Sequence, residues 1–146
     1  MRHLFLDTNV LLDFILKRDS FGPAAHQLFL AAEADEVVLY AAALSFSHIY
    51  YTLRKTNPPA ERILVLTALA NSVNIIPLTR PVVEAALTLG FPDFEDGLQY
   101  CAARLVPAIE AIVTRDPKGF AAGTLPVLLP LKALARLGSR PAQAAD

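Results

Sequence analysis

The fold is decided near the start of the chain, by the stretch Leu4-Phe5-Leu6-Asp7-Thr8-Asn9-Val10-Leu11-Leu12. A short apolar run stops at the carboxylate of Asp7, and an apolar-rich stretch resumes after two polar residues. This pattern is typical of a buried strand that passes into a helix. In an open α/β sheet, ligands bind in the crevice outside the carboxyl ends of the strands. Asp7 is therefore the first candidate for a functional site.

Asp7 also has a plain structural interpretation. Asp, Thr and Asn are preferred at helix N-caps, because their side-chain oxygens accept hydrogen bonds from the first free backbone N–H groups. Taken alone, the stretch favours capping. A chemical role becomes the better interpretation only if other carboxylates arrive at matching strand ends.

The composition limits the class of protein. With 146 residues the chain fits one domain, which we expect over residues 1–137, followed by a flexible tail over 138–146. No apolar run is long enough to span a membrane, so we expect a cytoplasmic protein. The single cysteine, Cys101, excludes an internal disulfide and a cysteine-rich metal site. The net charge is −1, so nucleic acid would have to bind a local basic patch.

Short apolar runs alternate with longer helical patterns along the chain, which predicts an α/β fold with a mainly parallel sheet. The predicted strands are 3–6, 37–41, 73–77 and 111–114, with an edge strand at 126–129. The predicted helices are 10–16, 24–34, 45–55, 59–70, 80–89, 93–106 and 131–137. The helical pair between the second and third strands is compatible with a hairpin that stands off the sheet and offers a surface to a partner.

A second acidic group, Asp93-Phe94-Glu95-Asp96, opens a predicted helix. Asp93 can serve as its N-cap, and Asp96 as a first-turn acid favoured by the helix dipole. Three carboxylates within four residues exceed that need and repel one another, which favours a cation or a basic partner. Of the three, we favour Asp96 as the site residue.

A third acid, Asp116, follows the predicted strand at 111–114 and begins the sequence Asp116-Pro117-Lys118-Gly119. A plain turn explains this sequence as well as chemistry does. Asp7, Asp96 and Asp116 can nevertheless converge on one crevice at the sheet edge. Carboxylates without histidine or cysteine clusters suit Mg²⁺ or Mn²⁺, which assist phosphodiester cleavage by activating water and stabilising negative charge. Together the acids predict nuclease chemistry.

Four segments resemble the motifs of the PIN domain family, in the family's order. They are residues 4–12, Ala43 to Lys55, Phe94 to Tyr100, and Ile112 to Asp116. The resemblance covers residues 3 to about 130 and implies a three-layer α/β/α sandwich with a metal-dependent site that cleaves single-stranded RNA. Many bacterial members of this size are VapC-type toxins held inactive by an antitoxin. With 54% hydrophobic residues, such a fold also leads us to expect a homodimer.

Carried over position by position, the resemblance makes Asp7, Asp96 and Asp116 the catalytic, metal-binding acids. The neighbours that orient ligands or water would be Thr8, Asn9 and Thr114. The basic residues expected to contact RNA are Arg115 and Lys118, which flank Asp116, together with Arg54 and Lys17.

Two positions depart from the family's pattern. His48 stands where toxin members usually carry a glutamate, and Gly119 stands where a further acid or asparagine often follows the last aspartate. A histidine can ligate a metal or bind phosphate, but it removes a negative charge, so metal affinity should fall. Glu95 or Asp93 can supply the missing carboxylate. A helix histidine bonded to a neighbouring side chain is the plain alternative for His48.

Two other functions stay open. The departures at His48 and Gly119 fit a PIN-like module with weakened catalysis that binds nucleic acid or protein. The strand-end Asp7 also resembles the nucleophile of haloacid dehalogenase-type phosphatases, but those enzymes need a second aspartate two residues on, where this chain has Asn9.

Overall fold

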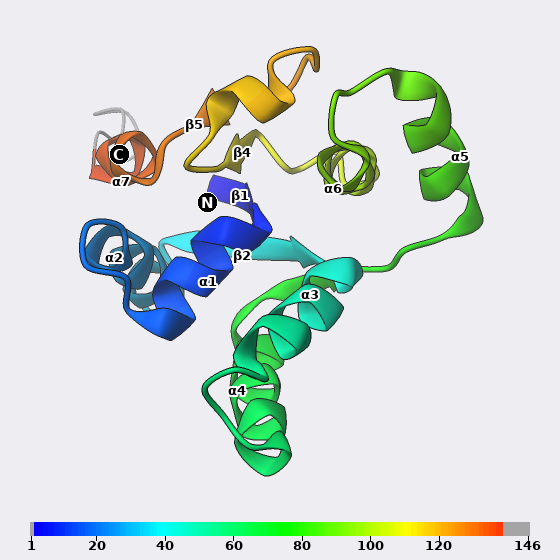
Figure 1. Ribbon diagram of the computed structural model, residues 1–146. Helices are drawn as coiled ribbons and strands as arrows, with labels where there is room; N and C mark the ends of the chain where they lie inside the picture. The colour runs from blue at the N-terminus through cyan, green and yellow to red at the C-terminus, as the bar shows by residue number, and fades with distance from the viewer. Residues whose placement is uncertain (1, 139–146) are drawn as a thin grey trace.

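A five-stranded parallel sheet forms the middle layer of the molecule (Figure 1). The computed structural model describes residues 2–138. The strands are β1 (Arg2–Leu6), β2 (Val37–Ala42), β3 (Asn74–Ile76), β4 (Ala111–Val113) and β5 (Val127–Leu128). Their order across the sheet is β3-β2-β1-β4-β5. β1 therefore lies at the centre, and its buried half, Leu4-Phe5-Leu6, is apolar on both faces, as a strand covered on both sides requires.

Helices join successive strands and cover both faces of the sheet. They are α1 (Thr8–Leu16), α2 (Gly22–Glu33), α3 (Ala43–Leu53), α4 (Pro59–Ser72), α5 (Arg80–Leu89), α6 (Phe94–Arg104) and α7 (Pro130–Gly138). A short 3-10 helix, η1 (Pro117–Phe120), follows β4 where the sequence favoured a plain turn. α1 begins at Thr8, two residues earlier than predicted.

Two apolar cores result from the alternation of side chains along the strands. Leu4 and Leu6 of β1 belong to a core shared with α1, α2, α4 and α7. Phe5 faces the opposite side, where it joins Ile112 of β4 and the buried residues of α5 and α6. Helices on both faces of one parallel sheet confirm the predicted three-layer α/β/α fold.

The positions at which several helices begin and end follow from the local sequence. α2 and α4 both carry a proline in their first turn, where no backbone N–H is needed. α5 ends at Gly90, whose φ of +80° lies in the left-handed region that glycine adopts without strain. The sequence predicted a tail from Gly138 onward. Gly138 is the last residue of α7, and residues 139–146 lie outside the described part of the chain.

The α3–α4 pair extends away from the sheet, as Figure 1 shows and as the sequence predicted. Leu69 is the buried residue of α4, near its carboxyl end. Within residues 2–138, no helix is long and apolar enough to cross a membrane.

The parallel arrangement brings three chain segments to one edge of the sheet. β1, β2 and β4 are neighbours and all point the same way, so the residues that follow them lie together. Asp7 follows β1, and its backbone N–H donates to the carbonyl of Val113 at the end of β4 (2.9 Å). α3 begins directly after β2 at the same edge.

Candidate active site

Asp7 occupies the N-cap position of α1, but its carboxylate is used elsewhere. Its carbonyl accepts the first helical hydrogen bonds, while its side chain caps no backbone N–H among residues 2–138. Oδ1 accepts a hydrogen bond from Gln99 Nε2 (2.9 Å), and Oδ2 accepts one from Thr114 Oγ1 (2.7 Å). The residue is 4% exposed. Helix capping therefore does not explain this side chain.

Gln99 holds Asp7 from α6, although the sequence analysis did not single it out. Its side chain is buried, and its Oε1 accepts from the Thr8 N–H (3.1 Å) while its Nε2 donates to Asp7. Thr8 Oγ1 also lies 2.7 Å from Ser45 Oγ in the first turn of α3. This buried network joins the starts of α1 and α3 to the middle of α6.

Helical periodicity could not have revealed Gln99. α6 is buried on all its faces from Gly97 to Ala103, so a polar residue there has no exposed face from which to be distinguished. The only sequence signal is a lone amide inside an otherwise apolar run.

Thr114 links Asp7 to Asp116. Its hydroxyl is buried; it donates to Asp7 Oδ2 and accepts from the backbone N–H of Asp116 (3.1 Å). Asp116 itself is exposed and occupies the N-cap position directly before η1. The predicted role of Thr114 as an orienting neighbour thus has a structural basis, because it contacts two of the three predicted acids.

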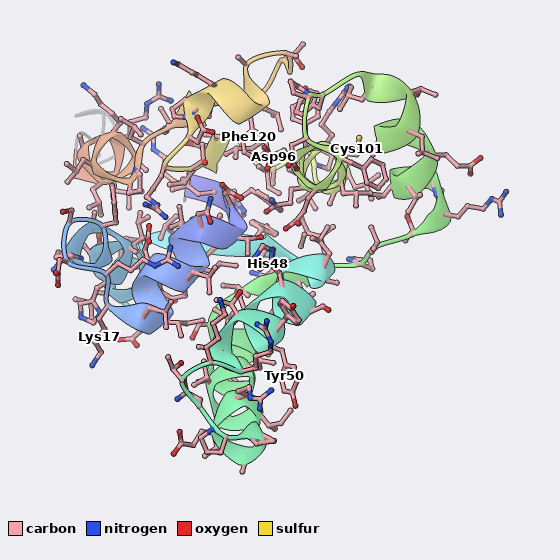
Figure 2. The ribbon with its side chains drawn as sticks, viewed as in Figure 1. Lys17, His48, Tyr50, Asp96, Cys101 and Phe120 are labelled. Atoms are coloured by element: carbon pink, nitrogen blue, oxygen red, sulfur yellow. The ribbon has the colours of Figure 1, made fainter. Side chains whose placement is uncertain are left out.

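Gly119 in η1 lies directly against Asp96. A Cβ atom at this position would stand 2.6 Å from Asp96 Oδ2 and 3.9 Å from Asp116 Oδ2. Asp96 and Asp116 therefore approach the same point, and glycine leaves the space that the Asp96 carboxylate fills. In Figure 2, Asp96 lies between α6 and the segment that contains Phe120. The three predicted acids lie together at the sheet edge.

The charges of the acids are not compensated where they meet. Burial and, after it, the negative charges of nearby carboxylates together raise the pKa of Asp96 from its ordinary value to about 7. These carboxylates are Asp7, Asp93, Glu95 and Asp116. Burial also raises the pKa of Asp7, against the hydrogen bonds from Thr114 and Gln99, which lower it.

Asp93 has the plain role that the sequence allowed. Its Oδ1 accepts a hydrogen bond from the Asp96 N–H (2.9 Å), so it is the N-cap of α6. Its carboxylate is exposed and contributes charge at the site through its influence on Asp96.

Carboxylate oxygens are the donor set that Mg²⁺ and Mn²⁺ prefer. Within residues 2–138, no group of three or more His, Cys, Asp or Glu side chains is gathered closely enough to enclose a metal ion. Mg²⁺ does not need such a cage, because it usually takes one or two carboxylates and keeps waters and phosphate oxygens as its other ligands. The carboxylates of Asp96 and Asp116 approach one point, and the negative charge of Asp116 helps to raise the pKa of Asp96. This pair therefore fits the requirement of Mg²⁺ for one or two carboxylates.

Comparison with known families agrees with this arrangement. The chain matches the profile of the PIN domain over residues 3–118, which is most of its length. The chain belongs to the PIN domain family. No curated protein sequence matches it significantly.

Solved structures share the fold of this PIN domain. One is VapBC2 from Rickettsia felis bound to a DNA fragment of its promoter, with a TM-score of 0.65 and 18% identity over 86% of this chain and 96% of that chain. Another is a toxin–antitoxin complex from Klebsiella pneumoniae, with a TM-score of 0.62 and 23% identity over 87% and 97%. A third is Mycobacterium tuberculosis VapC20, a toxin that cleaves the sarcin-ricin loop, with a TM-score of 0.64 and 15% identity over 84% and 96%.

His48 departs from the expected PIN pattern, and the structure gives it a specific partner. Its Nδ1 lies 2.8 Å from Glu95 Oε1, and both side chains are about two-fifths exposed. The contact joins α3 to the first turn of α6, where Glu95 directly precedes Asp96 in the chain. The plain interpretation, a helix histidine bonded to a neighbour, describes this contact. Glu95 also adds negative charge at Asp7 and Asp96.

The predicted RNA-contacting residues of the PIN domain are not all near the acids. Lys118 is exposed on η1, beside Gly119. Arg54 directly follows α3, and its guanidinium lies 3.6 Å from the centre of the Tyr51 ring. Lys17 follows the last turn of α1, at the opposite end of that helix from Asp7, and Figure 2 shows it away from Asp96.

Arg115 and Asn9 complete the set of predicted residues. Arg115 is next to Asp116 in sequence, but its guanidinium contacts Asp13 of α1, with Nε 2.9 Å from Oδ2. Asn9 is exposed in the first turn of α1, two residues after Asp7.

Proposed function

We propose that this PIN domain is a metal-dependent endoribonuclease that hydrolyses phosphodiester bonds in single-stranded RNA. The observation that supports it best is the position of Asp7. This buried carboxylate is held by Gln99 and Thr114 rather than capping its helix, and it faces the repelling pair Asp96 and Asp116. The raised pKa values of Asp7 and Asp96 mean that their charged forms are disfavoured, and a cation bound between the acids would offset this cost.

Asp96 and Asp116 would hold Mg²⁺ or Mn²⁺, with Asp7 completing the acidic side of the site. When bound, such a cation lowers the pKa of a coordinated water and stabilises the charge that develops on a phosphodiester. The residues around the acids fix their geometry. Thr114 and Gln99 each bind one oxygen of Asp7 and leave each oxygen a second lone pair.

RNA would approach from the exposed side of η1. Lys118 is the best-placed cation for a phosphate, because it is exposed and lies in the same turn as Gly119, which contacts Asp96. Arg54 and Lys17 would contact more distant parts of a longer substrate. Asn9 is exposed in the first turn of α1, where backbone N–H groups without a helical partner favour anions, whereas the Thr8 N–H is already bound by Gln99.

The biological role that we propose is that of a toxin with an antitoxin partner. The similar solved structures include a VapBC2 assembly and a toxin–antitoxin complex, and the fold of this chain matches both over more than four-fifths of its length. Expression of the chain alone should then arrest bacterial growth. We further propose a homodimer, which light scattering of the purified protein tests.

Purified protein should cleave single-stranded RNA with Mn²⁺ or Mg²⁺ and should stop when the metal is chelated. Asp7→Asn should abolish cleavage, whereas the matched control Asp35→Asn should not, because Asp35 is exposed between α2 and β2. Undiminished cleavage by Asp7→Asn would refute the assignment of Asp7.

The second candidate function is a PIN-like binding module with weakened catalysis. It is favoured by His48, which replaces an acid and pairs with Glu95. This function predicts negligible Mn²⁺ binding in calorimetry and no RNA turnover. Divalent binding together with cleavage would exclude it.

A further inference from the structure

A second buried carboxylate lies on α1, outside the cluster of acids described above. Asp13 is 0% exposed and follows Asp7 by less than two helical turns. A buried charge is costly unless it is paired, so its partners indicate its role.

Asp13 has two cationic partners of different origin. Arg18 Nη1 donates to Oδ1 (3.3 Å) from the turn that follows α1. Arg115 Nε lies 2.9 Å from Oδ2 and comes from the segment between β4 and η1. One contact is local, and the other joins parts of the chain that are far apart in sequence.

Arg115 is fixed on more than one side. Its guanidinium lies 4.2 Å from the centre of the Phe21 ring, and its side chain is 25% exposed. Its Nε–H is not aligned with Asp13 Oδ2 as a hydrogen bond requires, and within residues 2–138 neither atom has another hydrogen-bond partner. The contact is therefore an ion pair maintained by packing.

The position of Arg115 in the sequence makes this ion pair relevant to the acids. The preceding residue, Thr114, binds Asp7, and the following residue is Asp116. Two consecutive side chains thus attach the segment before Asp116 to α1, one at its N-cap and one at Asp13. Gly119, whose N–H donates to the Asp116 carbonyl (3.1 Å), follows in the same turn.

We propose that Asp13, acting through Arg115, is a positioning residue for Asp116. The ion pair holds the segment from Arg115 to Gly119 so that the Asp116 carboxylate and the Gly119 backbone stand against Asp96. The inference rests on the proposed nuclease function. It assigns Arg115 to an ion pair within the protein, in contrast to the sequence-based prediction that Arg115 contacts RNA.

The two roles of Arg115 predict different kinetics. If Arg115 positions Asp116, Asp13→Asn and Arg115→Met should each lower kcat at least tenfold, with KM for RNA and its salt dependence unchanged. The double variant should be no worse than either single variant, because both remove one interaction. Arg115→Lys keeps the charge and should recover part of the lost kcat.

Arg18→Met is the matched control. It removes the other cation from the same carboxylate, but Arg18 lies in the turn after α1 and does not adjoin Asp116. It should lower the melting temperature and leave kcat within about twofold of the wild-type value. If Asp13→Asn fails to fold, the comparison of Arg115→Met, Arg115→Lys and Arg18→Met carries the test.

Hydrogen exchange on the metal-free proteins supplies a readout that does not need activity. Exchange at the Asp116 and Gly119 amides should accelerate in Arg115→Met and not in Arg18→Met. Unchanged exchange with unchanged kcat would overturn the proposal, as would a raised KM with a reduced salt dependence, which would mean that Arg115 binds phosphate. If wild-type protein cleaves no RNA, the nuclease proposal fails, and the exchange comparison still decides whether Arg115 positions this segment.

Discussion

Replacing Asp96 by asparagine should stabilise the metal-free protein while removing its activity. The pKa of Asp96 is about 7 in the folded protein, against 3.8 as its ordinary value, because burial and four neighbouring carboxylates oppose its charge. Above pH 7 the folded state must therefore carry a charge that the unfolded chain carries at lower cost. Asparagine has nearly the same shape and carries no charge.

The magnitude follows from this difference in pKa. One pKa unit corresponds to about 1.4 kcal/mol, so the full effect would be about 4 kcal/mol. Asp96 is only partly buried, and solvent screening reduces this to roughly 1–2 kcal/mol. For a domain of this size, that is a rise of about 3–6 °C in the melting temperature.

The pH dependence has a definite sign. A raised folded-state pKa means that the folded protein binds more protons than the unfolded chain between about pH 4 and pH 7. Wild-type stability should fall as pH rises through this window, relative to Asp96→Asn. The advantage of the variant should be full at pH 8 and absent below pH 4.

Thermal unfolding in a chelator at several pH values measures this effect. Asp35→Asn, an exposed acid outside the cluster, is the matched control and should change little. Mn²⁺ should then raise the melting temperature of wild type more than that of Asp96→Asn, because a ligand stabilises the state that binds it. If Asp96→Asn is less stable than wild type at pH 8 without metal, the carboxylates do not repel one another and the argument for a cation site is wrong.

Three other substitutions test the geometry of the site. Gly119→Ala places a Cβ 2.6 Å from Asp96 Oδ2. Because the Asp96 carboxylate can rotate away, we expect a melting temperature within about 2 °C of the wild-type value but at least tenfold slower RNA cleavage. Full cleavage activity would contradict this prediction. Gln99→Leu leaves Asp7 Oδ1 without its amide donor. It should lower the free energy of unfolding, measured in urea, by about 2 kcal/mol. An unchanged midpoint of urea unfolding would show that the Gln99 amide does not hold Asp7. His48→Glu adds a carboxylate from α3 next to α6. It should tighten Mn²⁺ binding, measured by calorimetry, and destabilise the metal-free protein. Weaker Mn²⁺ binding would place residue 48 outside the metal site.

The sequence predicted the layers and the acids because both depend on local patterns. An apolar run of β-strand length that ends in a carboxylate identifies β1 and Asp7 together, and the same logic identifies β4 and the segment that leads to Asp116. Neighbouring parallel strands then bring these residues to one edge without further information. The four-residue helix η1 was missed because a proline–glycine turn sequence also describes it.

The partners of the acids could not be predicted in this way. Gln99 binds a residue 92 positions earlier in the chain, and the sequence contains no signal of that pairing. Ser45 and Asp13 are likewise buried polar residues on helices whose apolar pattern continues around them. Such contacts are set by how helices pack on the two faces of the sheet.

α1 illustrates this limit, because the sequence does not indicate that Asp13 is as buried as Asp7, the N-cap residue of the same helix. Asp13 lies between two guanidinium groups, so the protein itself compensates its charge. Asp7 receives hydrogen bonds from an amide and a hydroxyl, which are neutral, and its pKa is raised by burial. A buried carboxylate with cationic partners has a structural role, whereas one with neutral partners beside other acids is suited to bind a cation from outside the chain. The difference between the two aspartates of one helix is therefore the strongest physical reason to locate the chemistry at Asp7.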